Sequence, residues 1–552
     1  MTQAKVVNIS TFLTQMAARS PYKKAVIRPA GRDKSGRLAY THLTFEQLDH
    51  EADRLAHGLV KTGLAKGTRT IVMVGPSLEF FALTFAMFRV GAVPVLVDPG
   101  MGLDRMLTCL QEGRPEAFIG IPKAHVLRTL RPKYFKTVKK WITVGRRWYW
   151  GGPTLNGIRQ EKWTPFEPAA TLADETAAIL FTTGSTGPAK GVVYTYANFA
   201  AQIRQIQAHW EIGPDEIDLP TFPLFALFDP ALGMTAVIPD MDPTRPALVD
   251  PEKIIEPILD HGVTNMFASP ALLHRVGAHG AENGLKLPSL RRVVSAGAPV
   301  HPANIEQFSA LLTGGAEVHT PYGATEAVPV SSIAGEEILT ETRELTDQGG
   351  GNCVGRPLAG TEIEIIAIHD DPIAEWSSKL RLPDGEVGEI TVKGDVVARE
   401  YFERPRDTAL AVIKDRDGFR RRMGDLGWRD KKGRIWFCGR KSHRVITAGE
   451  TLFTIPCEAV FNNHPLVYRA ALVGVGPQGN QKPVICIEPH KKIKVPKDEL
   501  KKELLALARE TPMTSGIEAI LFHDSFPVDI RHNSKIFREK LAVWAAGKLK
   551  VK

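Results

Sequence analysis

The stretch AAILFTTGSTGPAKGVVYTY, residues 177–196, decides the fold because it places a glycine-rich polar loop between two apolar runs. The runs 177–183 and 191–196 are short and continuous, which is typical of buried strands. In the loop between them, backbone N–H groups in glycine-rich turns form a concave site for anions, and hydroxyl groups add donors. A lysine adds a point charge that suits phosphate. We therefore expect a phosphate-binding loop formed by Thr182, Thr183, Gly184, Ser185, Thr186, Gly187 and Lys190.

This loop differs from the phosphate loop of the P-loop nucleotide hydrolases. Their motif ends in Gly-Lys followed by Ser or Thr, and a helix follows it. Here Lys190 follows Ala189 and precedes Gly191, and the next segment is a predicted strand. The sequence therefore predicts a phosphate site of another design.

The most apolar segment of the chain, residues 69–100, is long enough to suggest a membrane span. We interpret it instead as a strand at 70–74, a helix that starts at Pro76 and a strand at 92–97, because polar residues and prolines interrupt it. The interrupting residues are Pro76, Glu79, Arg89 and Pro94. Buried strands joined by helices indicate a parallel sheet that is covered on both faces.

Further strands are predicted along the chain, and they extend the α/β pattern. The runs 291–297 and 316–323 each end in glycine, and 385–394 resembles part of a β-rich closing unit. Asn198 is a candidate N-cap for the helix after the loop. That helix has one apolar face, formed by Phe199, Ile203, Ile206 and Trp210.

The chain changes character after residue 440, and we predict a domain boundary there. Residues 1–440 form a large N-terminal domain with parallel-rich sheets, helices and the β-rich unit. Residues 441–552 form a small, mobile α/β domain, within the usual size range of domains. Its predicted elements are strands at 471–476, 483–489 and 517–522 and a helix at 497–510.

Composition narrows the class of protein. The 70 Lys and Arg residues exceed the 61 Asp and Glu residues, for a net charge of +9. The basic segment 491–497 and the C-terminal tail lack interleaved aromatic residues, so nucleic-acid binding is not favoured. The five cysteines form no CxxC pair, so neither a disulfide framework nor a zinc site is predicted. The first residues lack the apolar stretch of a signal peptide, and we expect a cytoplasmic protein.

Six motifs resemble those of the adenylate-forming superfamily, which includes acyl-CoA synthetases, luciferases and peptide-synthetase adenylation domains. They occur in the order of that family and cover essentially the whole chain. They are TTGSTGPAKGV at 182–192, SAGAPV at 295–300, PYGATEA at 321–327, RMGDLG at 422–427, GR at 439–440 and RHNSKIFREKL at 531–541. The resemblance implies ATP and Mg²⁺ as cofactors and adenylation of a carboxylic acid as the first reaction.

The resemblance also assigns roles to residues at the motif positions. Asp425 would accept hydrogen bonds from the ribose hydroxyls, and the negative charge of its carboxylate would strengthen these bonds. Arg440 would contact the ribose. Glu326 would bind Mg²⁺ through its carboxylate, Thr325 would donate to a phosphate oxygen, and Lys535 would bridge the carboxylate and the α-phosphate. The adenine would lie along Ala296, Gly297 and Ala298, with Tyr322 and Gly323 beside it.

Several positions depart from the acyl-CoA synthetase pattern. Ala226 stands where many such enzymes carry a histidine, and Ser442 and His443 replace the usual hinge residues. These departures resemble one branch of the superfamily, the olefin β-lactone synthetases, which act on long-chain 2-alkyl-3-hydroxy acids. The substrate's own 3-hydroxyl would then attack the adenylated carbonyl and release AMP. Because this attack is intramolecular, positioning the 3-hydroxyl against the acyl carbon takes the place of binding a second substrate.

The β-lactone hypothesis carries three further expectations. A general base would remove the hydroxyl proton, and the candidates are His319, Asp229 and His443. The segment 221–238 is apolar enough to line a tunnel for the alkyl chains, or simply to belong to the core. By resemblance, a condensing enzyme, a reductase and a decarboxylase of olefin biosynthesis are possible assembly partners.

Three other functions stay open at this stage. The first is a long-chain fatty acyl-CoA synthetase or fatty acyl-AMP ligase. The second is a nucleotide- or lipid-binding protein without catalysis, because fold does not fix function. The third is a nucleic-acid-binding protein, which would show steeply salt-dependent affinity.

Overall fold

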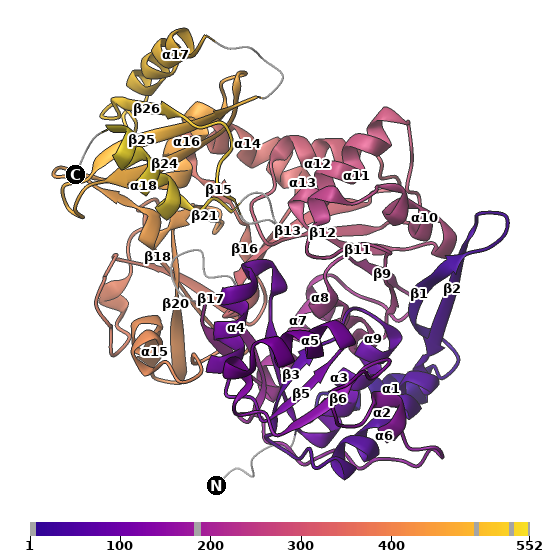
Figure 1. Cartoon of the computed structure of the whole chain (residues 1–552). Helices are drawn as coiled ribbons and strands as arrows, with labels where there is room; N and C mark the ends of the chain where they lie inside the picture. Colours follow the sequence, from indigo (N-terminus) through magenta and orange to yellow (C-terminus); the bar gives the residue numbers. More distant parts are fainter. Residues whose placement is uncertain (1–6, 182–188, 491–495, 529–534, 550–552) are drawn as a thin grey trace.

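The computed structural model describes residues 7–181, 189–490, 496–528 and 535–549. Figure 1 shows two large layered units, in indigo to pink, that lie against each other. The C-terminal segment, in yellow, lies over the orange strands at one side of them. The α/β class with parallel-rich sheets and helices is confirmed, whereas a boundary at 440/441 stays a prediction.

The first large sheet carries the strands on either side of the predicted phosphate loop. Its order is β6-β5-β3-β4-β7-β8, and β7 and β8 pair antiparallel while the other neighbours run parallel. The strands are β3 (Arg69–Met73), β4 (Val93–Val97), β5 (Ala117–Gly120), β6 (Lys140–Thr143), β7 (Thr176–Phe181) and β8 (Gly191–Thr195). The helices of this region are α1 (Thr11–Arg19), α2 (Phe45–Lys61), α3 (Leu78–Val90), α4 (Leu103–Glu112), α5 (Pro122–Leu130) and α6 (Leu155–Ile158).

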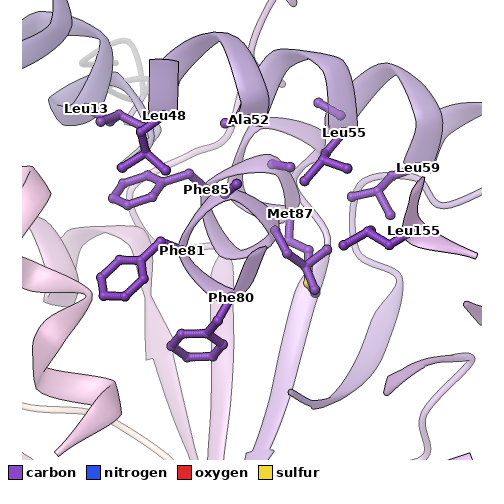
Figure 2. Packing of buried hydrophobic residues seen from close by; sticks show 14 of the residues in the cluster. Leu13, Leu48, Ala52, Leu55, Leu59, Phe80, Phe81, Phe85, Met87 and Leu155 are labelled. Atoms are coloured by element: carbon purple, nitrogen blue, oxygen red, sulfur yellow. The ribbon is translucent and has the colours of Figure 1, made fainter. Parts of the chain in front are cut away.

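The apolar segment 69–100 forms β3, α3 and β4, as predicted. The helix begins at Leu78 rather than Pro76, because the Ser77 side chain accepts the backbone N–H of Phe80 as an N-cap. Every residue of α3 from Phe80 to Val90 is buried, and Figure 2 shows Phe80, Phe81 and Phe85 below the labelled residues of α2. The segment is hydrophobic all round because it lies inside the domain. In the described part of the chain, no helix combines the length and apolarity that a membrane span requires.

The second large sheet has nine strands in the order β16-β14-β13-β12-β11-β9-β10-β1-β2. Its central strands run parallel, and antiparallel pairs close both ends. The strands are β1 (Lys24–Arg32), β2 (Leu38–Thr44), β9 (Ile217–Pro220), β10 (Thr235–Val237), β11 (Asn265–Ala268), β12 (Arg292–Ser295), β13 (Glu317–Ala324), β14 (Ala327–Ala334) and β16 (Arg356–Pro357). The helices are α7 (Tyr196–His209), α8 (Pro223–Ala226), α9 (Phe228–Leu232), α10 (Glu252–His261), α11 (Pro270–Glu282), α12 (Pro302–Ser309), α13 (Gly335–Glu337) and α14 (Arg343–Leu345).

The cap of α7 differs from the prediction. Thr195, not Asn198, is the N-cap residue, and its hydroxyl accepts the backbone N–H of Asn198 at 3.2 Å. Asn198 is the third helical residue, and its side chain accepts the backbone N–H of Thr195 at 3.0 Å. The two residues form a reciprocal capping box, so the pattern marked the helix start three residues late.

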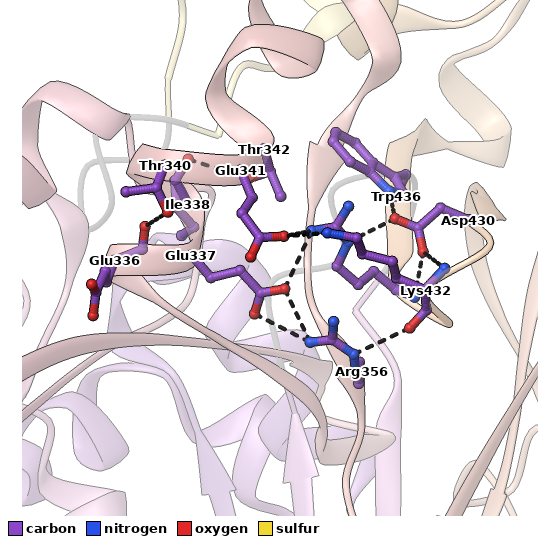
Figure 3. Close-up of polar contacts among 11 residues, drawn as sticks. Glu336, Glu337, Ile338, Thr340, Glu341, Thr342, Arg356, Asp430, Lys432 and Trp436 are labelled. Atoms are coloured by element: carbon purple, nitrogen blue, oxygen red, sulfur yellow. Dashed lines mark hydrogen bonds and ion pairs between the residues drawn. The ribbon is translucent and has the colours of Figure 1, made fainter.

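A third, antiparallel sheet forms the β-rich unit. It runs β15-β21-β20-β18-β17, with β19 paired to β20. Its elements are β15 (Asn352–Cys353), β17 (Thr361–Ile366), β18 (Gly388–Gly394), β19 (Val412–Asp415), β20 (Gly418–Arg429), β21 (Ile435–Arg440) and α15 (Pro405–Ala411). Figure 3 shows one link to the second sheet: Arg356 of β16 donates to the backbone carbonyl of Lys432, between β20 and β21, at 3.2 Å. Arg434 also pairs with Asp430 at 2.7 Å and with Glu341, in the segment after β14, at 2.9 Å.

The C-terminal segment has its own sheet and core. β24 and β25 pair antiparallel, and β25 and β26 pair parallel. Leu472 and Ile485 point to the core under α16 and α17, whereas Val473 and Val484 point to the core under α18. The elements are β22 (Val445–Ile446), β23 (Thr451–Leu452), β24 (Val467–Val475), β25 (Lys482–Pro489), β26 (Ala519–Phe522), α16 (Thr454–Asn462), α17 (Lys497–Glu510) and α18 (Arg538–Leu549).

Candidate active site

A cavity of about 1680 Å³ brings the predicted site residues together. Every residue within the described ranges that the motifs assign to nucleotide, metal or carboxylate binding lines it. These residues are Lys190, Ala296, Gly297, Ala298, Tyr322, Gly323, Thr325, Glu326, Asp425, Arg440 and Lys535. Thr182, Thr183, Gly184, Ser185, Thr186 and Gly187 lie outside the described residues. The shared cavity makes a common role for the lining residues geometrically possible, and their individual roles stay predictions.

Asp425 is the centre of one polar cluster in the cavity wall. The Tyr322 hydroxyl donates to its Oδ2 at 2.6 Å, and Arg440 Nη1 lies 3.0 Å from its Oδ1. Asp425 and Arg440 are register partners on β20 and β21, so the sheet itself sets this pair. Burial raises the pKa of the Asp425 carboxyl above its ordinary value, although Arg440 and the Tyr322 hydrogen bond oppose the rise.

Glu326 is the centre of a second cluster, between β13 and β14. The Tyr401 hydroxyl donates to Glu326 Oε1 at 2.6 Å. The Arg421 guanidinium lies 4.4 Å from the centre of the Tyr401 ring and donates to the Ala398 carbonyl at 2.6 Å. Burial raises the pKa of Glu326, but Arg421 and the Tyr401 hydrogen bond outweigh it, and the net pKa is lowered. The carboxylate is therefore held ionised in the cavity wall.

Sequence reasoning missed Tyr401 and Arg421. Tyr401 lines the cavity, and its ring also lies 4.9 Å from Lys190 Nζ. Lys190 in turn pairs with Asp407 at 2.6 Å. Tyr401 therefore joins the end of the predicted phosphate loop to Glu326, although 75 residues separate it from Glu326. No local pattern marks such a residue, because its partners lie in distant parts of the sequence.

Two backbone features position the strip around Glu326. The Tyr194 hydroxyl donates to the Thr325 carbonyl, so β8 holds the residue before Glu326. Gly323 must be glycine, because a Cβ there would lie 2.5 Å from the Ala327 carbonyl oxygen. This close approach lets β13 turn into β14 directly beside the site.

Lys535 comes from the C-terminal segment and lines the same cavity as Asp425 and Glu326. Its neighbour Ile536 forms a β-bridge with Val528, and Arg538 donates to Glu458 of α16 at 2.8 Å. Contacts of Ile536 and Arg538 thus hold the chain directly after Lys535.

The three candidate bases lie in different places. His443 lines the cavity, whereas neither His319 nor Asp229 belongs to its lining. Burial, with Arg292 and His209 nearby, lowers the pKa of His319 to about 4. Burial and the carboxylate of Asp218 raise the pKa of Asp229 far above its ordinary range. His443 is therefore the candidate that the geometry favours.

The apolar wall of the cavity draws on the predicted tunnel segment and on other elements. From 221–238, the cavity takes eight residues, whereas Ala226, Met234 and Val237 belong to the buried core. The eight are Thr221, Phe222, Pro223, Leu224, Phe225, Leu227, Phe228 and Ala231. Phe80, Phe85 and Phe88 of α3 and Leu127 of α5 complete the wall, which the sequence did not indicate. The segment thus contributes both to the cavity wall and to the core, and its role as a tunnel for alkyl chains stays a prediction.

Comparisons with known proteins identify the family and the fold. Residues 13–402 match the family model described as AMP-binding enzyme. The chain is 48% identical to an olefin beta-lactone synthetase of Xanthomonas campestris over 98% of this chain and 97% of that protein. It is 48% identical to the olefin beta-lactone synthetase of Stenotrophomonas maltophilia over 98% of both chains. A long-chain-fatty-acid–CoA ligase of Mycobacterium tuberculosis is 27% identical over 85% of this chain.

Solved structures of similar fold have lower sequence identity. An amide bond synthetase from Marinactinospora thermotolerans superposes with a TM-score of 0.77 at 22% identity, covering 97% of this chain and 99% of that one. The o-succinylbenzoate coenzyme A synthetase of Bacillus subtilis, in complex with AMP, gives 0.75 at 22% identity, covering 97% and 98%. These likenesses concern the fold.

Proposed function

Since the chain belongs to the AMP-binding enzyme family, we propose that it is an ATP-dependent olefin β-lactone synthetase. It adenylates a long-chain 2-alkyl-3-hydroxy acid and closes the product through the acid's own 3-hydroxyl, releasing pyrophosphate and AMP. The observation that carries the proposal is 48% identity to curated olefin beta-lactone synthetases over almost the full length of both chains. The CoA ligase relative reaches only 27%.

In the first half-reaction, a carboxylate oxygen of the acid attacks the α-phosphorus of ATP, and the bond to pyrophosphate breaks. The two reactants repel each other, so cationic side chains that hold both anions lower the barrier. Lys535 would hold the carboxylate against the α-phosphate, and Lys190 would contact the outer phosphates. Asp425 would accept the ribose hydroxyls, with Arg440 beside it, and Tyr322 would flank the adenine.

The residues around Glu326 fit a magnesium ion that is held mainly by nucleotide. Among the described residues, no group of three or more His, Cys, Asp or Glu side chains is arranged to hold a metal. One ionised carboxylate in the cavity wall matches the way Mg²⁺ is bound in nucleotide sites, by one or two carboxylates plus phosphates. The ion would neutralise phosphate charge. Tyr401 would hold the Glu326 carboxylate in place, and Thr325 would donate to a phosphate oxygen.

In the second half-reaction, the 3-hydroxyl oxygen attacks the acyl carbon, and the bond from that carbon to AMP breaks. The hydroxyl proton passes to a base, and we assign that role to His443 because it lines the cavity. The reacting groups belong to one molecule, so positioning replaces binding of an acceptor. Ala226, which stands where many CoA-dependent relatives carry a histidine, is buried in the core and does not line the cavity.

Product analysis with and without CoA tests the proposal. The purified chain is incubated with ATP, Mg²⁺ and a long-chain 2-alkyl-3-hydroxy acid, and the products are separated by mass. A β-lactone formed without CoA is the expected result. A CoA-dependent thioester would identify an acyl-CoA synthetase, and a released acyl-AMP that never cyclises would identify an acyl-AMP ligase; either result overturns the proposal.

The proposed activity has a place in olefin biosynthesis. A condensing enzyme and a reductase would supply the 3-hydroxy acid, and a decarboxylase would convert the lactone to an alkene in the cytoplasm. The lactone is a strained ring, so direct transfer to the consuming enzyme would limit its hydrolysis. Co-purification of these enzymes with the tagged chain would test this assembly.

A further inference from the structure

We propose that the surface around α5 docks onto a membrane that carries anionic lipid. The apolar part of the active-site cavity, which we call the acyl cavity, takes up its substrate there. We call this surface the α5 patch, and it consists of Leu130, Arg131, Arg146, Trp148 and Tyr149. The uptake of substrate rests on the proposed function, because it assumes a long-chain acid. Membrane binding itself can be measured without any turnover.

Two segments meet to form the α5 patch. β5 and β6 pair in parallel, so α5 and the loop after β6 both leave the same sheet edge. The loop then folds back on the helix: the hydroxyl oxygens of Thr129 and Tyr149 lie 3.5 Å apart. The rings of His125 and Trp150 stack with their centres 5.1 Å apart. Buried Trp150 therefore fixes the loop that carries Trp148 and Tyr149.

The patch exposes large apolar and aromatic side chains to solvent. Tyr149 is 73% exposed, Leu130 is 65% exposed and Trp148 is 54% exposed. Exposed hydrophobic groups that cluster on one surface mark an interaction site. Tryptophan and tyrosine in particular favour the interface between lipid headgroups and hydrocarbon, where one part of the ring system is apolar and the other is wet.

The positive charge around the α5 patch favours a negatively charged partner. The thirty residues 121–150 contain nine Lys and Arg residues and no Asp or Glu, so they account for the entire net charge of +9. Arg131, directly after Leu130, and Arg146, two residues before Trp148, are both exposed. Basic side chains next to Trp, Tyr and Leu are the combination that binds anionic lipid surfaces. Neither predicted basic segment, 491–497 or the tail, has this aromatic content.

The acyl cavity reaches the surface at the same place. Leu103, Ile121 and Leu130 line the cavity and are also exposed, and Leu127 continues the apolar wall inward. An alkyl chain can therefore pass from a bilayer into the cavity without crossing water. A nucleic acid or an acidic protein would use the positive charge, but neither would use an apolar opening beside the aromatic side chains. The combination favours a lipid surface.

Sedimentation with vesicles tests the proposal on the full chain. We expect binding to vesicles of equal parts phosphatidylcholine and phosphatidylglycerol, and little binding to phosphatidylcholine alone. R131E/R146E reverses two charges of the patch, and W148S/Y149S removes its aromatic residues; each should weaken binding by about tenfold or more. K34E/R37E, in the exposed turn between β1 and β2 of the other large sheet, makes the same charge change and should bind like the parent.

Activity of the patch variants on detergent-dispersed acid shows whether they still fold and react when no membrane is needed. Neither patch variant changes a residue that lines the cavity, so both should release pyrophosphate at the parent rate with dispersed acid and more slowly with vesicle-bound acid. Absence of binding to anionic vesicles, or equal loss in K34E/R37E, would overturn the docking surface. Binding of duplex DNA that depends on Arg131 and Arg146 but not on Trp148 and Tyr149, with vesicles left unbound, would also overturn it. Failure of pyrophosphate release in the parent would overturn the proposed function instead.

Discussion

The Tyr322 hydroxyl donates to the Asp425 carboxylate at 2.6 Å, and Arg440 meets the other oxygen of that carboxylate at 3.0 Å. Three strands of two sheets thus converge on one buried acid. Before nucleotide binds, these two groups already hold the carboxylate in one orientation. In our account this preorganised acid binds the ribose of ATP.

Asp425→Asn should therefore weaken ATP binding. Hydrogen bonds to a charged group contribute about 1.5–3 kcal/mol, so the KM for ATP should rise about tenfold to a hundredfold. Pyrophosphate release at varied ATP measures it. Asp430→Asn is the matched control, because Asp430 also pairs with an arginine, Arg434, but lies in the network of Figure 3 outside the cavity lining. An unchanged KM in Asp425→Asn would contradict the assignment.

The pH dependence of ATP binding should follow from the same residue. Burial raises the pKa of the Asp425 carboxyl, and only the ionised form offers two charged acceptor oxygens. ATP affinity should therefore be full above the raised pKa and should fall as the pH falls through it, at a pH where an ordinary aspartate is still ionised. Asp425→Asn should abolish that change. Titration of ATP affinity against pH, with parent and variant side by side, measures the difference.

Lys535→Ala should slow adenylation and spare ATP binding. Removing one group that stabilises developing charge lowers rates by about a hundredfold to a thousandfold, and we expect that loss in pyrophosphate release. Lys540→Ala removes an exposed lysine of α18, outside the cavity lining, and should behave like the parent. If pyrophosphate release in Lys535→Ala equals that of the parent, the role assigned to Lys535 is wrong.

His443→Ala should separate the two half-reactions. Loss of a general base slows proton removal by about a hundredfold to ten-thousandfold, so the acyl-AMP should accumulate while its formation continues. Quenched reactions analysed by mass for acyl-AMP and lactone measure both. His319→Asn is the control, since His319 does not line the cavity, and it should keep the parent ratio of the two products. Equal slowing of both steps in His443→Ala would point to a structural role.

Arg89→Met should destabilise the fold without a direct effect on the reacting groups of the active site. Arg89 is buried in the helical layer and pairs with Asp49 and Asp53. Removing one partner of a buried ion pair costs about 3–5 kcal/mol because the other charges stay buried. The melting temperature should fall by several degrees, whereas Arg19→Met, at an exposed position, should leave it nearly unchanged. A melting temperature equal to that of the parent would show that Met packs there without cost.

Arg89 also illustrates what the sequence can and cannot predict. Its charge in an apolar segment correctly argued against a membrane span, because burying a charge requires partners. The partners themselves, on α2, could not be inferred, since they depend on how two helices pack. The candidate active site also has residues that the sequence predicts and residues that it does not. Motif residues predicted from short patterns line one cavity. Tyr401, which donates to Glu326, and Arg421, whose guanidinium lies against the Tyr401 ring, belong to none of the six motifs.

The central claim is that the carboxylate, and not the hydroxyl, is adenylated before the ring closes. A substrate with a heavy oxygen isotope in its carboxylate tests this directly, with AMP and lactone analysed by mass after one turnover. We predict that the label appears in AMP and that a label placed in the 3-hydroxyl stays in the lactone. Label from the hydroxyl in AMP, or AMP without label from the carboxylate, would contradict the account.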